Sequence, residues 1–205
     1  MAKVKILFQG YTSGEANGHT CSTVVLVQDK DKNGTVNIIS DPGSLPNKNN
    51  LITALKKENL TPADINFVFL THQHLDHFMY LGLFENAKII FNDGMMKNDF
   101  WEPMQELIPD EGCITKDIKI IKTPGHSDDS ITLLVKTKVD GKNSAANGKN
   151  SVVAICGDVF WKKDYPEKDK YANNLKQLEK SRKKLLELAD YIIPGHGGMF
   201  RVGII

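Results

Sequence analysis

Thr71-His72-Gln73-His74-Leu75-Asp76-His77 is the stretch that decides the fold and the chemistry of this chain. It places four potential metal ligands within six residues, in a chain that contains only six histidines. The apolar run at residues 67–70 comes directly before it and predicts a fully buried strand. Because side chains alternate along a strand, we expect His72 and His74 to point to the same side where that strand ends.

Three later segments place a similar side chain after a predicted strand. They are Thr123-Pro124-Gly125-His126, Cys156-Gly157-Asp158 and Pro194-Gly195-His196-Gly197. In each one a glycine precedes the polar residue, so the backbone can turn tightly there. Imidazole nitrogens and carboxylate oxygens are common zinc ligands, and two ions need more donors than the first motif offers. We therefore expect these segments to meet in one metal site.

Strand and helix patterns alternate in two similar halves of the chain. Helical spacing predicts helices at residues 50–57 and from about 173 to 189, and Thr61-Pro62-Ala63-Asp64 looks like another helix start. The predicted strands are residues 4–8, 22–28, 35–40, 67–70, 88–91, 119–122, 131–135, 152–156 and 191–193. This order fits an α/β sandwich of two sheets with helices outside, as one domain over residues 1–205.

The amino-acid composition of two segments in the second half predicts how each of them is exposed to solvent. Residues 136–151 are rich in Lys, Asn, Gly and Ser, which predicts a long solvated hairpin loop without a binding role. The helix at about 173–189 carries an apolar side and a charged side, and the charged side is expected to face solvent. Its apolar side consists of Leu175, Leu178, Leu185, Leu186 and Ala189.

Composition excludes some classes of protein. The formal net charge of +1 does not indicate a nucleic-acid binder. The three cysteines form no C-x-x-C pair and are odd in number, so we expect thiols rather than disulfides, and a cytoplasmic location. The apolar run at the N-terminus is too short for a signal peptide, and no stretch approaches the length of a membrane span.

The order T-H-Q-H-L-D-H, T-P-G-H, G-D and P-G-H-G resembles the metallo-β-lactamase superfamily, from about residue 8 to residue 200. The resemblance implies a four-layer αβ/βα sandwich with a dinuclear site at one edge. It also implies that Asp158 bridges the two ions and that Asp41 orients a ligand. The first ion would take His72, His74 and His126, and the second would take Asp76, His77 and His196.

The ligand set implies a hydrolase. Two ions, zinc or alternatively manganese or iron, would lower the pKa of a shared water and polarise the substrate, while Asp76 and Asp158 balance charge and orient that water. We expect a small-molecule or nucleotide-type substrate, with an ester, thioester, lactone or phosphodiester bond. The Leu81-Gly82-Leu83-Phe84 segment with Asn86-Ala87-Lys88 is similar to a small single-domain group of the superfamily, one member of which is assigned ribonuclease activity, so RNA stays open.

Two other functions remain open. A mononuclear iron persulfide dioxygenase shares this fold, but such enzymes fill only one site, whereas both ligand sets look complete here. A non-catalytic binding module usually loses ligands, and no loss is visible in this sequence. The amount and identity of bound metal separate these classes from a dinuclear hydrolase.

Several residues near the motifs have ordinary interpretations. We expect His19 to be no ligand, and Asp128 and Asp129 to lie in a solvated turn near the site entrance. Trp161 and Tyr165 are either substrate-facing or packed, and the sequence does not separate these. The lysines that follow Asp158 are expected in an exposed polar loop, with the rim of the site as the alternative: Lys162, Lys163, Lys168 and Lys170.

Overall fold

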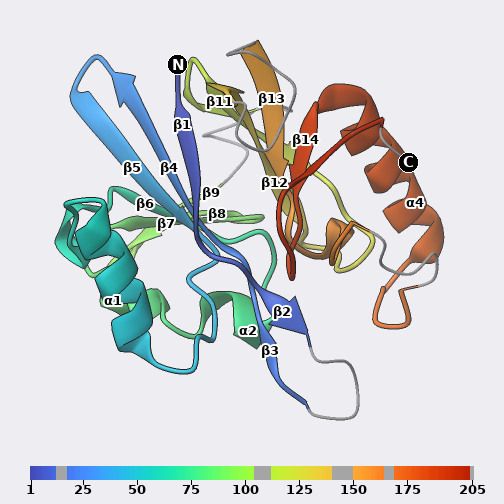
Figure 1. Ribbon diagram of the computed structural model, residues 1–205, viewed down its shortest axis with the longest axis horizontal. Coiled ribbons are helices and arrows are strands. Elements are labelled where there is room, and N and C mark those ends of the chain that lie inside the picture. Colours follow the sequence, from blue (N-terminus) through green and yellow to red (C-terminus); the bar gives the residue numbers. More distant parts are fainter. Residues whose placement is uncertain (13–17, 104–111, 140–149, 164–168, 204–205) are drawn as a thin grey trace.

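The structure is a computed structural model that describes residues 1–12, 18–103, 112–139, 150–163 and 169–203. Within these residues the strands form two large sheets and a small hairpin (Figure 1). The hairpin pairs β2 (Tyr11–Thr12) with β3 (Thr20–Cys21). Tyr165 and Lys168 lie outside the described residues.

The first sheet contains seven strands among the described residues, in the order β1-β4-β5-β6-β7-β8-β9. Its strands are β1 (Lys3–Phe8), β4 (Val24–Asp31), β5 (Gly34–Ser40), β6 (Phe67–Phe69), β7 (Lys88–Phe91), β8 (Gly94–Lys97) and β9 (Phe100–Pro103). The strands β5, β6 and β7 run parallel. Their carboxyl ends therefore lie at the same edge of the sheet.

The second sheet contains six strands in the part of the chain that the structure describes, in the order β10-β11-β12-β13-β14-β15. They are β10 (Gly112–Thr115), β11 (Ile118–Lys122), β12 (Ile131–Lys138), β13 (Asn150–Ile155), β14 (Tyr191–Ile193) and β15 (Phe200–Arg201). The pair β13 and β14 is parallel, so the segments that follow these two strands also emerge together.

The buried side chains separate into three layers of core, which explains the four-layer architecture. Val25 and Val27 of β4 pack with Leu133 and Val135 of β12 in the cluster between the two sheets. The alternate β4 residues, including Leu26, belong to the cluster on the outer face. Since both faces of β4 are covered, its apolar run is continuous rather than alternating. The predicted sandwich is confirmed.

One helix covers the outer face of each sheet (Figure 1). Helix α1 (Lys48–Lys57) places Leu51 and Leu55 against the first sheet. Helix α4 (Leu175–Leu188) places Leu178 and Leu185 against the second. Within the described residues, the other helical segments are α2 (Leu75–Phe78) and the 3-10 turns η1 (Pro62–Asp64), η2 (Leu81–Leu83) and η3 (Gly157–Val159).

Three expectations from the sequence need correction. The segment at residues 61–64 is a single 3-10 turn, because the backbone is already extended at Ile65 and the chain then enters β6. The hairpin strands β12 and β13 extend to Lys138 and from Asn150, so they shorten the predicted 136–151 loop. Leu175 is 42% exposed, since it lies in the first turn of α4, before the helix meets the sheet.

Candidate metal centre

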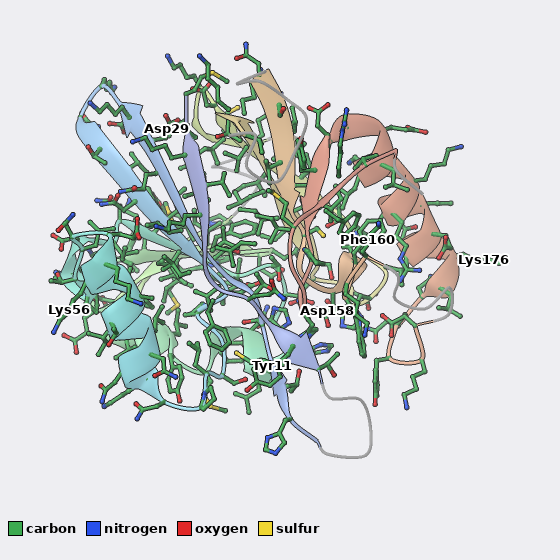
Figure 2. The ribbon with its side chains drawn as sticks, viewed as in Figure 1. Tyr11, Asp29, Lys56, Asp158, Phe160 and Lys176 are labelled. Carbon is green, nitrogen blue, oxygen red and sulfur yellow. The ribbon has the colours of Figure 1, made fainter. Side chains whose placement is uncertain are left out.

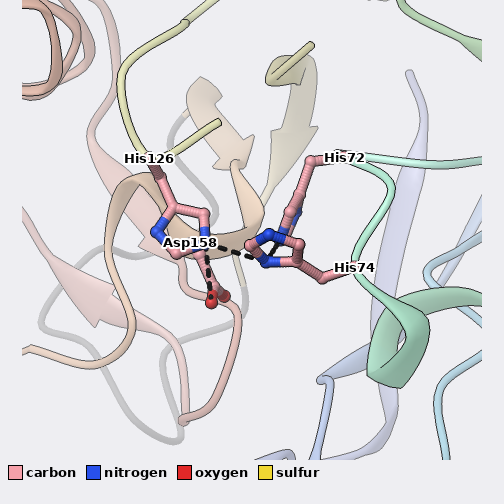
Figure 3. A group of neighbouring side chains, drawn as sticks. All are labelled: His72, His74, His126 and Asp158. Carbon is pink, nitrogen blue, oxygen red and sulfur yellow. Dashed lines mark hydrogen bonds and ion pairs between the residues drawn. The ribbon is translucent and has the colours of Figure 1, made fainter. Parts of the chain in front are cut away.

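The structure brings the seven predicted ligands together at one edge of the sandwich, where Asp158 lies near β2 in Figure 2. They form two groups, and the ligand atoms of each group lie within 4.8 Å of one another. The first group, drawn in Figure 3, is His72, His74, His126 and Asp158, and the second is Asp76, His77 and His196. The motif segment follows β6, and the other three segments follow β11, β13 and β14. Segments far apart in sequence thus meet at the strand ends.

Asp158 lies between the two groups. Its Oδ2 atom is 3.5 Å from His126 Nε2 and 3.3 Å from His196 Nε2, and its Oδ1 atom is 3.3 Å from His77 Nε2. The carboxylate therefore contacts histidines of both groups. This is the position that a residue shared by two cations would need.

The ring nitrogens and carboxylate oxygens of the site are arranged as cation ligands rather than as a complete set of mutual hydrogen bonds. The Nε2 atom of His72 lies 3.0 Å from His74 Nδ1, which lies 3.1 Å from His126 Nε2 (Figure 3). His77 Nε2 and Asp158 Oδ1 are buried and make no hydrogen bond, although they face each other. Buried polar atoms without a hydrogen-bond partner are rare in native structures, and a bound ion is one way in which two such atoms that face each other are satisfied. A set of imidazoles and carboxylates suits zinc and also manganese or iron.

Gly195 leaves the space that the Asp158 carboxylate occupies. A Cβ atom at residue 195 would overlap Asp158 Oδ1. The Gly195 N–H donates to the carbonyl oxygens of Gly157 and Phe160, both at 2.9 Å. The loop after β14 therefore packs directly on the loop that carries Asp158.

Asp41 holds the second group through His77. Its Oδ2 atom lies 3.0 Å from His77 Nδ1 and accepts a hydrogen bond from the Thr71 hydroxyl at 2.7 Å, while Oδ1 accepts from the Thr71 N–H at 2.9 Å. Because the carboxylate binds Nδ1–H, the Nε2 atom of His77 is left to face the site. Asp41 therefore lies beside a candidate ligand, and its role in orienting that ligand stays a prediction.

His196, His72 and His126 are also oriented through their second ring nitrogen. His196 Nδ1 lies 3.0 Å from the Cys21 carbonyl oxygen, and His72 Nδ1 lies 3.1 Å from the Thr71 hydroxyl. His126 Nδ1 lies 2.6 Å from the Oδ2 atom of Asp169, a buried carboxylate that the sequence analysis did not single out. A metal-binding histidine usually donates its second N–H to a carboxylate or carbonyl group. This rule predicts a partner for His126 but does not identify Asp169 as that partner.

Burial and neighbouring charges together set the pKa shifts of the site's titratable groups. Burial disfavours the charged form of His77, but Asp41 and Asp158 outweigh it and hold its pKa well above the ordinary value. His196 behaves likewise, because Asp158 raises its pKa against the effect of burial. The pKa values of His72 and His74 are lowered, first by burial and then by charge on neighbouring histidines. Burial raises the pKa of Asp158, but His196 and His77 bring it well below the usual range.

A cavity of about 800 Å³ opens over both groups. Thr12, Gly18, His19 and Thr20, from the hairpin and the segment before β3, line this cavity together with Trp161 and Tyr171. The two aromatic rings are stacked, with centroids 5.5 Å apart and an angle of 10° between their planes. His19 lines the cavity and is not a member of either candidate ligand group.

Trp161 and Asp129 are more closely tied to the site than their sequence context indicated. Trp161 is 8% exposed and packs edge-on against His126 and His196, with ring centroids 6.2 and 5.8 Å away. Asp129 accepts a hydrogen bond from the Gln73 N–H at 2.9 Å, so it is not simply solvated. Asp128 is exposed, as are Lys162, Lys163 and Lys170.

The comparisons with known proteins agree with this fold. The Metallo-beta-lactamase superfamily model matches residues 18–114. "Metallo-beta-lactamase domain-containing protein 1" of Xenopus laevis is 29% identical over 97% of this chain and 81% of its own. A Methanocaldococcus jannaschii protein, provisionally named a metallo-hydrolase, is 31% identical over 79% of this chain and 71% of its own.

A solved structure agrees as well. A Thermotoga maritima protein provisionally named a metallo-beta-lactamase superposes with a TM-score of 0.70 at 22% identity, covering 98% of this chain and 99% of that one. An α/β sandwich with a histidine–aspartate cluster at its edge defines a metal-dependent protein of the hydrolase type. The chain belongs to the metallo-β-lactamase superfamily. The Xenopus match also confirms the expected subgroup resemblance.

Two further observations concern the chain as a whole. All three cysteines are free thiols, with Cys21 and Cys156 buried and Cys113 exposed. Among the described residues, no helix has the length and apolar character needed to cross a membrane.

Proposed function

We propose that the protein is a dinuclear metal-dependent hydrolase, with zinc as its metal, acting on an ester, thioester, lactone or phosphodiester. The observation that carries this proposal is the position of Asp158 between two groups of ligand atoms. A mononuclear site would need only one group and would leave the other as a costly cluster of buried polar atoms. Relatives named as metallo-hydrolases support the reaction type.

The chain's own residues prepare the site for hydrolysis. When bound in pairs, divalent ions supply an acidic water and polarise the bond that breaks. Asp158 and Asp76 bring negative charge to the site, and the Thr20 hydroxyl fixes Asp76 by donating a hydrogen bond to its Oδ2 atom at 2.8 Å. Trp161 shields His126 and His196 on one side, which lowers the local dielectric and strengthens electrostatic interactions within the site.

The cavity favours a small substrate with a flat or apolar portion. Tyr171 is 52% exposed and presents its ring beside the ligand groups. Thr12 and Thr20 of the hairpin also line this cavity. A dizinc quorum-quenching lactonase shares the fold at a TM-score of 0.57 and 15% identity, which makes a lactone one sensible member of a substrate panel.

Metal analysis combined with a substrate panel tests this proposal. The panel contains a glutathione thioester, simple lactones, a β-lactam, a phosphodiester and single-stranded RNA. We expect two zinc ions per chain and hydrolysis of at least one substrate. Asp158→Asn should lose metal and activity together, whereas Asp128→Asn, which makes the same chemical change at an exposed residue, should retain both. One iron per chain with persulfide oxidation would instead establish the dioxygenase, and an inert metal-free protein would indicate a binding module.

A further inference from the structure

Each ligand group contains one histidine that is backed by a buried carboxylate from outside the group. In the second group this pair is His77 and Asp41. In the first group it is His126 and Asp169, with 2.6 Å between Nδ1 and Oδ2. Both carboxylates are fully or almost fully inaccessible to solvent. Carboxylates are rarely buried this completely unless they are paired with another group. The histidine is the partner in each case, which indicates that the pairing has a role.

We propose that Asp169 is a positioning residue that sets the metal affinity of the first group through His126. The inference rests on the metal binding that the proposed function assumes. The carboxylate accepts the Nδ1 proton, which fixes the tautomer of His126 and leaves its Nε2 lone pair toward His74 and Asp158. Negative charge next to the ring also makes Nε2 a stronger donor toward a cation.

The backbone around Asp169 is arranged to keep this contact in place. Its Oδ1 atom accepts a hydrogen bond from the Tyr171 N–H at 2.9 Å, and its carbonyl oxygen accepts from the Ala172 N–H at 3.3 Å. The next two N–H groups reach back to the histidine loop. Asn173 donates to the His126 carbonyl oxygen at 3.0 Å, and Asn174 donates to that of Gly125 at 2.9 Å.

Helix α4 packs directly on the same loop. Gly125 has φ +136°, and a Cβ atom there would overlap the backbone of Leu178. The Ser181 hydroxyl donates to the Pro124 carbonyl oxygen at 2.7 Å. The loop that carries His126 is therefore held from one side by α4 and by the segment that begins at Asp169.

The same carboxylate joins the metal group to the wall of the cavity. One oxygen of Asp169 contacts His126, and the other contacts the N–H of Tyr171, whose ring stacks on Trp161. A change at Asp169 should thus affect the first ligand group and the aromatic wall together, while the second group keeps its own carboxylate, Asp41.

Asp169→Asn is the most informative substitution because it preserves the shape of the side chain. The amide oxygen can still accept from the Tyr171 N–H, but the NH₂ group would then donate toward His126 Nδ1. That arrangement favours the His126 tautomer with its proton on Nε2, which opposes metal binding there. Asp128→Asn, an exposed residue in the loop that follows His126, is the matched control.

The readout is metal affinity, measured by titrating the metal-free protein with Zn²⁺ against a chromophoric chelator and with Co²⁺ by visible absorbance. We expect Asp169→Asn to weaken one of two binding steps by about 10–100-fold. Asp41→Asn should weaken the other step, and Asp128→Asn should weaken neither. Equal affinities in Asp169→Asn and wild type would overturn the inference, and hydrolysis by both proteins would show that the proposed function survives it.

A second measurement does not depend on the variant folding. In zinc-loaded wild type with ¹⁵N-labelled histidine, the Nδ1 proton of His126 should be visible by NMR and exchange slowly, because Asp169 buries it. Fast exchange of that proton would refute the contact. If wild type binds two ions and hydrolyses nothing in the panel, the proposed function fails while the role of Asp169 stands.

Discussion

His77 Nδ1 lies 3.0 Å from the Oδ2 atom of Asp41, a residue 36 positions earlier in the chain, and both side chains are almost completely buried. The contact links the loop after β5 to the motif after β6, so part of the fold and one ligand depend on the same carboxylate. Asp41 has φ 48°, a left-handed conformation that aspartate and asparagine adopt more readily than most residues. Substitutions at this position can therefore separate the carboxylate's charge from its shape.

Asp41→Ala should destabilise the metal-free protein more than Asp41→Asn does. Alanine leaves the buried Thr71 N–H without its acceptor and is strained at a positive φ, whereas asparagine can still accept that hydrogen bond. We expect a loss of about 3 kcal/mol in the free energy of unfolding for alanine and about half of that for asparagine. Urea unfolding of both variants measures the difference. Equal losses would mean that the hydrogen bond to Thr71 contributes little.

Gly195→Ala should remove metal binding while leaving the sheets intact. The added methyl group would occupy the position of Asp158 Oδ1, which contacts His77. Small-to-large changes in a packed region typically cost about 1–3 kcal/mol, so the chain should still fold. We expect elemental analysis to find fewer than two ions per chain.

Gly82→Ala is the matched control for this substitution. A Cβ atom at residue 82 meets nothing within 4 Å, so this variant should keep its metal and its thermal stability. Full metal content in Gly195→Ala would show that the Asp158 loop can shift without loss of binding.

Metal binding should depend on pH differently in the two groups. The pKa values of His77 and His196 are raised above the usual value of about 6.5, so these histidines remain protonated above that pH in the metal-free protein. A cation must displace those protons, and its apparent affinity for the second group should rise about tenfold per pH unit for each proton released. His72 and His74 have lowered pKa values and offer no such competition.

A Zn²⁺ titration followed between pH 6 and pH 8.5 by calorimetry checks this difference. One binding step should release protons and strengthen with rising pH, and the other should change little. Two steps with the same pH dependence would contradict the assignment of raised pKa values to one group alone.

The clustering of the candidate ligands could be predicted because each of them follows a recognisable strand pattern in the sequence. His72 and His74 follow a buried apolar strand, and Asp158 and His196 follow others with a glycine before each. The edges of the sheets were not predictable in the same way. Met96, Phe100 and Trp101 are exposed on strands β8 and β9, so these strands show no alternation of apolar and polar residues in the sequence. Hydrogen bonding between the neighbouring strands stabilises β8 and β9 instead.

Asp169 shows a different limit of the sequence. It stands in a lysine-rich stretch that is typical of an exposed loop, between Lys168 and Lys170. It is buried only because the chain folds back on the loop of His126, 43 residues earlier, where the ring nitrogen requires an acceptor. The composition of a segment predicts the average exposure of its residues. It gives no information about a hydrogen-bond partner that is distant in the sequence.

Tyr171→Ala should weaken substrate binding without changing metal content. The ring lines the cavity and stacks on Trp161, and Tyr171 is not a member of either candidate ligand group. Loss of an aromatic contact of about 1 kcal/mol corresponds to an increase in KM of about fivefold, measured with whichever panel substrate is hydrolysed. Tyr171→Phe keeps the ring and should retain the wild-type KM, which separates stacking from the hydroxyl group. A fall in kcat together with a loss of zinc in Tyr171→Ala would instead indicate that this ring supports the ligand loop, because Asp169 binds the N–H of the same residue.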